Sequence, residues 1–157
     1  MELRTERGRI AIVRENQNVV QWSIEAVAAG ASDPPVMVSD QADPSLLHLA
    51  ASSVTEFALQ LLVLNAKFSD RTDLFRANGQ ATDDGCAAIE QCLNRLPFGD
   101  LHWPPFPTRL YGDDAILAEV DGLTWVWITT RDGEAFERVL KIAEDAGICW
   151  ESLERPH

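Results

Sequence analysis

The stretch that decides the fold is residues 108–130, which read TRLYGDDAILAEVDGLTWVWITT. Three runs rich in apolar residues are separated by short segments of Gly and Asp, a pattern that predicts three β-strands joined by turns. An Asp-Gly pair between two apolar runs is a strong signal for a tight hairpin. The expected strands are 108–112, 115–120 and 123–130, and the expected turns are Gly112-Asp113-Asp114 and Asp121-Gly122.

The last of these strands has apolar side chains on both of its faces. Trp125 and Trp127 face one way, and Val126 and Ile128 face the other. Apolar residues on both sides are typical of a strand that is central in its sheet and covered on both faces. We therefore expect these two tryptophans, and Trp150 further on, to lie in the core.

A second hairpin is expected near the N-terminus. Residues 8–14 (GRIAIVR) and 19–24 (VVQWSI) have strand character and flank the polar turn 15–18. Two prolines within 30–35 interrupt this sheet, because proline cannot lie inside a central strand. A short strand is expected after them, at 36–38.

Three helices are expected. Ser53 and Glu56 have the spacing of a capping box, in which each side chain bonds the other residue's free backbone amide. The helix that they open is apolar nearly all round as far as about Phe68, so we expect it to be buried at the centre of the fold. The second helix is expected over 83–96, with Cys86, Ile89, Leu93 and Leu96 inward. The third is expected over 133–146, with cap residues Asp132 and Gly147, inward residues Phe136, Val139, Leu140 and Ala143, and a final strand at 148–150.

The order of these elements predicts the fold class. Antiparallel hairpins interrupted by helices are typical of an α+β fold with a mixed, largely antiparallel sheet. The chain has 157 residues and shows no internal repeat or linker, so we expect a single domain over residues 1–157.

The charge of the chain excludes several classes of partner. Thirteen Lys and Arg against twenty-five Asp and Glu give a formal net charge of −12. Residues 77–157 carry fifteen acids and six bases, a net charge of −9. A general nucleic-acid binder or a protein that docks on anionic lipid needs a basic face, so neither is expected. The acidity is consistent with solubility alone or with a basic partner.

The N-terminus and the cysteines indicate the cytoplasm. The first eight residues lack the apolar run of a secretory signal. Cys86, Cys92 and Cys149 form no CxxC pair, so we expect buried thiols and not a zinc site or a disulfide framework. Eleven of the thirteen basic residues are Arg, a bias that indicates a GC-rich, bacterial genome.

No motif predicts catalysis, a cofactor or a metal. The sequence contains no GxxxxGK[ST], GxGxxG, GxSxG or HExxH. The paired carboxylates at 83–84 and 113–114 fall at a helix start and in a hairpin turn, where Asp is common for structural reasons. His48 is expected to point off a strand. His102 near Asp100 could serve as a general base, although a loop contact is the simpler interpretation.

Four residues are predicted to contact a partner. Trp22 and Trp103 lie next to expected loops, where a half-exposed tryptophan beside acids makes a recognition surface. Asp113 and Asp114 lie at the tip of an acidic hairpin.

The order of several short motifs resembles the SUKH superfamily, which includes bacterial immunity proteins and cell-wall-assembly regulators. The motifs are ENQNVVQW (15–22), DPPV (33–36), SSVTEFALQLLVL (52–64), Trp103 with Thr108-Arg109-Leu110-Tyr111, and the closing segment 115–150. The resemblance implies a mixed sheet packed with helices and no catalytic machinery. Bacterial members bind toxins, often nucleases or deaminases. Relatives carry a helical segment before the first strand, whereas only residues 1–7 precede it here, so we expect a shortened variant or a start further upstream.

Three functions remain open at this stage. The first is an immunity-type protein that binds and neutralises a toxin, for example a basic nuclease. The second is a regulatory adaptor that binds a cellular partner. The third is a hydrolase that uses Asp100 and His102, or a carboxylate pair with a metal.

Overall fold

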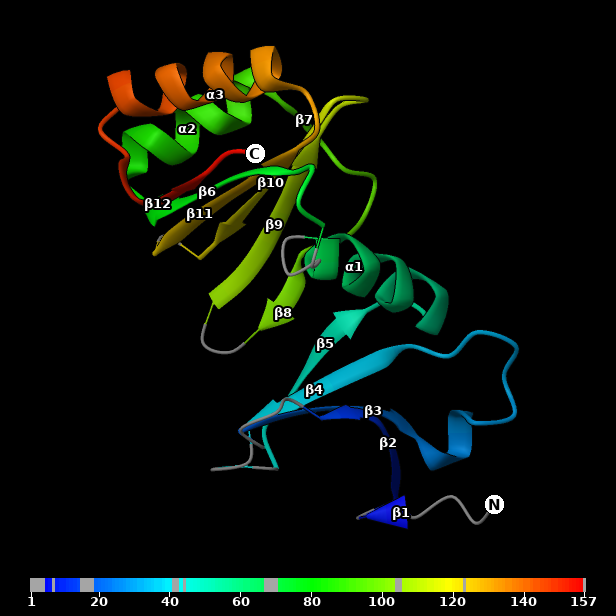
Figure 1. The fold of residues 1–157 in the computed structure, drawn as a ribbon. Helices are drawn as coiled ribbons and strands as arrows, with labels where there is room; N and C mark the ends of the chain where they lie inside the picture. The colour runs from blue at the N-terminus through cyan, green and yellow to red at the C-terminus, as the bar shows by residue number, and fades with distance from the viewer. Residues whose placement is uncertain are drawn as a thin grey trace. The chain divides into compact units, whose positions relative to one another are not determined.

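The computed structural model describes residues 5–6, 8–14, 19–40, 43, 45–66, 71–103, 106–122 and 124–156 (Figure 1). Its contacts cluster into two compact units. Unit 1 comprises 1–60 and 99–107, and unit 2 comprises 61–98 and 108–157. The sequence predicted a single domain over residues 1–157 and gave no sign of this division into two units. The α+β class is confirmed, since two antiparallel sheets and three α-helices are present among the described residues.

Unit 1 contains an antiparallel sheet whose five strands follow chain order. They are β1 (Thr5–Glu6), β2 (Arg9–Arg14), β3 (Val20–Glu25), β4 (Val36–Asp40) and β5 (Leu47–Ala51), with a 3-10 turn, η1 (Ala26–Ala28), after β3. The predicted hairpin of β2 and β3 is confirmed, with Ile10 opposite Ile24. The predicted turn at 15–18 lies outside the described residues.

Trp22 lies in the core of unit 1. Its side chain is 1% exposed, and its ring lies 5.9 Å from the ring of Phe57. The prediction of a half-exposed contact residue is therefore wrong at this position. Trp22 pairs with Val38 on the next strand, and this register places it on the covered side of the sheet.

Helix α1 (Val54–Ala66) begins with half of the predicted capping box. The Ser53 hydroxyl accepts the backbone amide of Glu56 at 3.0 Å, as expected. The Glu56 carboxylate does not reach back to Ser53. It accepts the backbone amide of Ser52 at 2.8 Å and that of Gly99 at 2.7 Å.

The sequence predicted that helix α1 is buried on all sides, and this prediction is wrong. Phe57 and Gln60 are buried, but Leu59 is 43% exposed and Leu62 is 69% exposed. The Gln60 amide donates to the carbonyl of Gly99 at 2.9 Å, so a polar residue occupies the inward face.

Unit 2 contains the larger sheet, in the order β12-β6-β11-β10-β9-β7 (Figure 1). Its strands are β6 (Phe75–Gln80), β7 (Asn94–Arg95), β9 (Phe106–Gly112), β10 (Ile116–Asp121), β11 (Trp125–Thr130) and β12 (Cys149–Glu154), and β8 (Leu101–Trp103) pairs with β9. The three strands expected at 108–130 are confirmed as β9, β10 and β11. β6 was not predicted from the sequence.

Helices α2 (Asp83–Cys92) and α3 (Gly133–Asp145) cover one face of this sheet (Figure 1). Their inward residues match the prediction except at Leu96, which is only half-buried. Asp132 caps α3 by accepting the amides of Glu134 and Ala135. Gly147 has the positive φ of 90° that favours glycine after a helix.

Helix α2 ends earlier than predicted. Leu93 is already extended, with φ −125° and ψ 148°. The next two residues form β7 and pair with Gly112 and Tyr111. Pairing with the sheet therefore ends the helix before residue 96, the end that the sequence predicted.

Candidate functional site

Acidic and tryptophan side chains share the face of the larger sheet that lies opposite α2 and α3. Along β10 and β11 the residues alternate between the two faces, and Ile116, Ala118, Val120, Val126 and Ile128 pack under the helices. Their neighbours point to the other side. We call Glu119, Asp121, Trp125 and Trp127 the tryptophan face.

Two tryptophans lie next to each other on this face. Trp125 and Trp127 are half-buried, and their ring centroids are 6.4 Å apart with planes tilted by 36°. The sequence predicted a strand that is covered on both sides. The strand is central, but only its helix side is fully buried, because Val126 and Ile128 are at most 1% exposed whereas the tryptophans retain accessible surface.

Two carboxylates lie opposite these rings. In the antiparallel register of β10 and β11, Glu119 pairs with Trp127, and Asp121 pairs with Trp125. Such directly opposed side chains have Cβ atoms about 4.5–5.5 Å apart. Asp121 accepts the hydroxyl of Thr108 at 3.0 Å, which fixes the position of its carboxylate. Glu119 is only 7% exposed.

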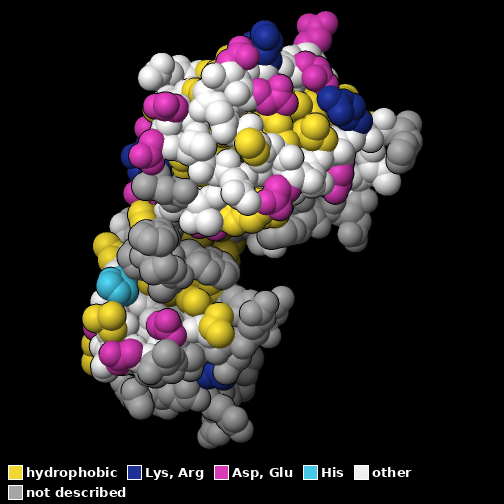
Figure 2. All heavy atoms as spheres, turned by 90° about the vertical axis from the view of Figure 1, so that its left-hand side faces the viewer, with side chains coloured by type: hydrophobic (Ala, Val, Ile, Leu, Met, Phe, Trp, Pro, Cys, Tyr) yellow, Lys and Arg dark blue, Asp and Glu magenta, His cyan; other side chains and the backbone are white. Residues whose placement is uncertain are grey.

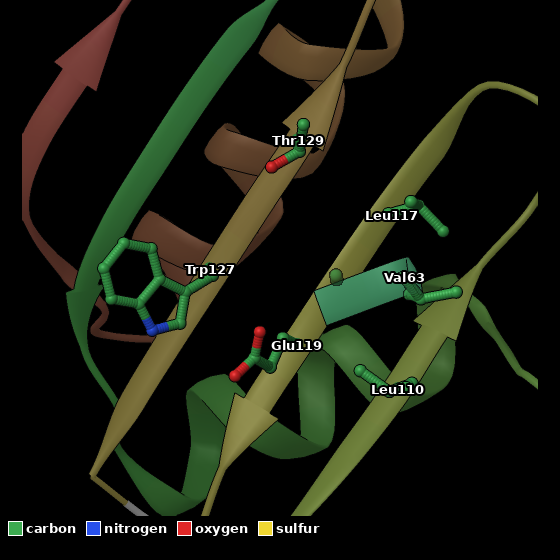
Figure 3. A pocket seen from close by; sticks show the side chains of 7 residues that line it. Val63, Leu110, Leu117, Glu119, Trp127 and Thr129 are labelled. Carbon is green, nitrogen blue, oxygen red and sulfur yellow. The ribbon is translucent and has the colours of Figure 1, made fainter. Parts of the chain in front are cut away.

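A small pocket adjoins the tryptophan face. It holds a void of about 10 Å³, lined by Val63, Leu110, Leu117, Ala118, Glu119, Trp127 and Thr129. In Figure 3 the Glu119 carboxylate and the Trp127 indole project from neighbouring strands on the same side of the sheet. A void of this size accommodates about one water molecule, so it cannot enclose a small organic ligand.

Asp113 and Asp114 line a second and wider hollow at the hairpin tip. An open groove of about 510 Å³ is lined by Leu74, the segment Asp113–Leu117 and the segment Thr129–Asp132. Asp113 accepts the amides of Ala115 and Ile116 at 2.8 and 3.0 Å, so it stabilises the turn. Asp114 is exposed. Asp113 therefore has the turn-stabilising role that is common for Asp.

Basic side chains beside this groove are paired with acids. Arg71 binds Asp73 at 2.6 Å, and Arg131 lies 3.7 Å from the same carboxylate. The hydrogen bond from Arg71 lowers the pKa of Asp73 to about 2. Asp73 therefore remains ionised at physiological pH and offsets part of the positive charge near the groove.

A third acidic region lies where α3 ends beside the start of α2. The Thr82 hydroxyl donates to the carbonyl of Ala146 at 3.2 Å, so the two helix ends are adjacent. The first turn of α2 contains Asp83 and Asp84, and the last turn of α3 contains no basic residue. Glu144 and Asp145 are exposed in that last turn.

A polar cluster links α2 to β9. Tyr111 donates its hydroxyl to Glu90 at 2.8 Å, and Arg109 forms an ion pair with the same carboxylate. Burial, together with the hydrogen bond to Glu90, raises the pKa of Tyr111 to about 12. The cluster therefore holds the helix on the sheet, and its tyrosine is not poised to ionise at neutral pH.

The predicted contact residues belong to two different units of the chain. Trp22 is in the core of unit 1, whereas Asp113 and Asp114 are at the hairpin tip of unit 2. Trp103 is in β8, but its side chain lies outside the described residues, as does that of His102. Among the side chains that the structure describes, no group of three or more His, Cys, Asp or Glu is placed to hold a metal ion.

The tryptophan face was not predicted as a site, because the apolar pattern of residues 123–130 placed both tryptophans in the core. A signal was present. The Asp121-Gly122 turn sets the register of the hairpin, and that register pairs Trp125 with Asp121 and Trp127 with Glu119. Two aromatic residues opposite two acids on one face are unusual for a buried surface.

The chain was compared with known proteins in three ways. No family model, no curated protein and no solved structure matches it. Within the part of the chain that the structure describes, no helix is both long enough and apolar enough to cross a membrane.

Proposed function

We propose that this protein is a non-catalytic binding module that neutralises a basic bacterial toxin by binding to it, in the manner of an immunity protein. The support is the sequence resemblance to the SUKH superfamily together with the distribution of acidic residues. The net charge of −12 favours a partner of opposite charge.

The observation that carries the proposal is the position of Glu144 in the last turn of α3. A helix C-terminus has partial negative charge, so acids in its last turn lower stability and bases would raise it. Helix α3 nevertheless has acids and no base there. The first turn of α2 adds two more acids beside it. Asp145 lies 3.6 Å from Lys141, an i,i+4 pair that offsets its cost, so Glu144 is the acid whose position is better explained by binding than by folding.

The acidic surface would act mainly on the rate of association. Figure 2 shows Asp and Glu side chains on the face in view, with some Lys and Arg side chains and exposed hydrophobic side chains among them. A field of one sign attracts a partner of the opposite sign and raises the rate of encounter. The exposed apolar side chains would then contribute contact area in the bound state.

The proposal is tested by co-expression. Each reading frame adjacent to the gene is expressed in a bacterial host with and without this protein, and growth is followed. We expect one product to be toxic alone and harmless in the presence of the protein, and the purified pair to bind with micromolar or tighter affinity. If no adjacent product is toxic and none binds, the proposal fails.

The same experiment separates the toxin-binding function from the regulatory adaptor. An immunity gene becomes dispensable when its toxin gene is deleted as well. An adaptor gene keeps its deletion phenotype in that double deletion.

A further inference from the structure

We infer that the groove at the tip of the β9–β10 hairpin binds a long basic side chain, lysine or arginine, that the partner protein presents. This groove is the open hollow of about 510 Å³ described above, and we call it the hairpin groove. The inference rests on the proposed function, because it places the recognition of a basic partner at one part of the acidic surface. The proposed function itself requires only the negative charge of that surface.

Three aspartates at the rim of the hairpin groove can still accept hydrogen bonds. Asp113, Asp114 and Asp132 line the groove and are exposed. Asp113 accepts the amides of its turn, and Asp132 accepts those of the first turn of α3, through Oδ1 in each case. Among the described residues, none of the three carboxylates forms an ion pair. Two of them are therefore held in place by the backbone while Oδ2 stays available to a ligand.

The arginines nearest the groove do not neutralise these aspartates. Arg131 is on the rim but lies 3.7 Å from Asp73, and Arg71 binds the same carboxylate at 2.6 Å. The three groove aspartates and Asp73 are four acids against these two bases, so negative charge is in surplus. A surplus of this sign favours a cationic ligand.

A buried hydroxyl group lines the same groove. Thr129 is only 8% exposed, and within the described part of the chain its hydroxyl has no hydrogen-bond partner. The hydroxyl of the neighbouring Thr130, in contrast, donates to the carbonyl of Ala115 and accepts the amide of Asp132. A buried hydroxyl without a partner lowers stability. A donor in the groove, such as the N–H of a basic side chain, would supply the missing bond of Thr129.

The floor of the groove is apolar, which favours a long basic side chain over other cations. Leu74 and Ile116 are at most 9% exposed, and Leu117 is half-buried opposite Thr129 on the next strand (Figure 3). Lys and Arg pack their aliphatic stems on apolar surface while the charged head remains at its polar edge. An apolar floor under an acidic rim therefore matches both parts of such a side chain.

The openness of the groove favours a side chain carried on a protein over a free small molecule. Pockets for small molecules are mostly apolar and enclose most of their ligand. Here the rim residues Asp113, Asp114, Arg131 and Asp132 are all exposed, so a free molecule would remain largely in solvent. An apolar centre within a polar rim is typical of a protein–protein interface.

The test uses the whole protein and two synthetic probes of equal charge. One is nona-arginine, and the other is a nonapeptide of 2-amino-3-guanidinopropionic acid, whose guanidinium groups are on shorter stems. Affinity is measured by calorimetry at one fixed salt concentration. We expect nona-arginine to bind at least about fivefold more tightly, because its longer stems bury more apolar surface on the floor. Equal affinity for the two probes would show that charge alone attracts them, and would overturn the inference.

The decisive comparison is between two variants with the same change of charge. D113N/D114N removes two acids from the hairpin groove, and D83N/D84N removes two from the first turn of α2. Asparagine keeps the Oδ1 acceptor that the turn at Asp113 uses, so the hairpin is expected to persist. We expect the first variant to weaken nona-arginine binding at least about tenfold and the second less than about threefold. Equal losses would contradict a site in the groove.

The variant T129V tests the buried hydroxyl without a change of charge. Valine keeps the shape of threonine and removes its hydroxyl. We expect nona-arginine to bind about fivefold more weakly, while the melting temperature of the free protein does not fall, because the hydroxyl has no partner there. Native affinity in T129V would count against the inference.

Failure of the inference and failure of the proposed function are distinguishable. If the groove variants bind like their controls but the co-expression test succeeds, the toxin-binding function survives, since an acidic surface elsewhere is enough for it. If the groove variants lose affinity selectively but no adjacent product is toxic or binds, the toxin is rejected and the groove is retained as a site for basic side chains.

Discussion

At the scale of single residues, Gly79 shows how closely two strands approach. A Cβ atom added at Gly79 would lie 2.4 Å from the carbonyl oxygen of Cys149 and 2.9 Å from the Cα of Trp150. Both atoms belong to the backbone of β12, which has an irregular register between Trp150 and Ser152. β12 therefore cannot tolerate a side chain at this position without moving.

Gly79→Ala is expected to lower the free energy of unfolding by about 1–3 kcal/mol, the usual range for overpacking. Urea denaturation measures the change. Gly30→Ala is the matched control, because no atom lies within 4 Å of an added Cβ there. An equal effect of the two substitutions would show that β12 does not press on Gly79.

Trp22→Ala is expected to be destabilising by about 3–5 kcal/mol, as for other large buried aromatic residues. The reason is its burial against Phe57. Thermal unfolding followed by circular dichroism measures the loss. A change below about 0.5 kcal/mol, which is typical of exposed positions, would restore the original interpretation of Trp22 as a surface residue.

The sequence does not distinguish Trp22 from Trp125 in exposure. Both lie in short strands next to an expected turn, and both have apolar residues two positions away, Val20 and Ile24 for Trp22 and Trp127 for Trp125. Their burial depends on what covers each sheet face. Helix α1 supplies Phe57 above Trp22, whereas α2 and α3 pack on the opposite side of the sheet from Trp125. Coverage of this kind is a tertiary property and is not encoded in a local pattern.

At the scale of elements, helix α3 was predicted almost completely and strand β6 was missed. Helix α3 has an apolar stripe with helical spacing, an Asp at its N-cap and a Gly after its end. β6 reads FRANGQ, which contains residues that are depleted in strands. It forms because β11 and β12 pair with it on both sides.

The two ends of α3 provide a matched pair of substitutions. Glu144→Gln removes an acid from the last turn and is expected to raise stability by about 0.3–1 kcal/mol. Glu134→Gln removes an acid from the first turn, where negative charge is favourable, and is expected to lower stability by a similar amount. Chemical denaturation at low salt measures both. If both substitutions changed stability in the same direction, an acid in the last turn of α3 would not be unfavourable for folding.

The start of α1 is expected to make stability depend on pH. Hydrogen bonds from the Ser52 hydroxyl and the Gly99 amide lower the pKa of Glu56 below its usual value of 4.5. A carboxyl group whose pKa is lower in the folded state stabilises the fold above its unfolded pKa. That contribution is lost as pH falls through the lower, folded pKa.

The melting temperature is therefore expected to fall more steeply below about pH 4.5 in the native protein than in E56Q. At pH 7 the native protein should be the more stable of the two, and the difference should shrink toward pH 3. Parallel curves for the two proteins over that range would contradict this role of Glu56.

At the scale of the whole molecule, the net charge of −12 is expected to set the kinetics of binding to a basic peptide such as nona-arginine. We expect the association rate of nona-arginine to fall by about tenfold between low and near-physiological salt, because screening shortens the range of the field. Stopped-flow tryptophan fluorescence measures the rate. The dissociation rate should change much less, and a rate of association that is independent of salt would argue against steering by the acidic surface.

The fold class was predictable at this scale, and the division of the chain was not. Alternating apolar runs and capped helices indicate an α+β protein from local signals alone. The two units depend on which distant segments pack together. Residues 99–107 return to unit 1 after nearly forty residues of unit 2, and nothing in their composition marks that return.

This interleaving limits how the protein can be dissected. A cut after Gln60 keeps all of unit 2 in one fragment but separates residues 99–107 from the rest of unit 1. A cut after Pro107 keeps unit 1 intact and divides unit 2. No single truncation keeps both units whole, so deletion mapping of a partner contact would mislead, and point substitutions in the full-length chain are the sound approach.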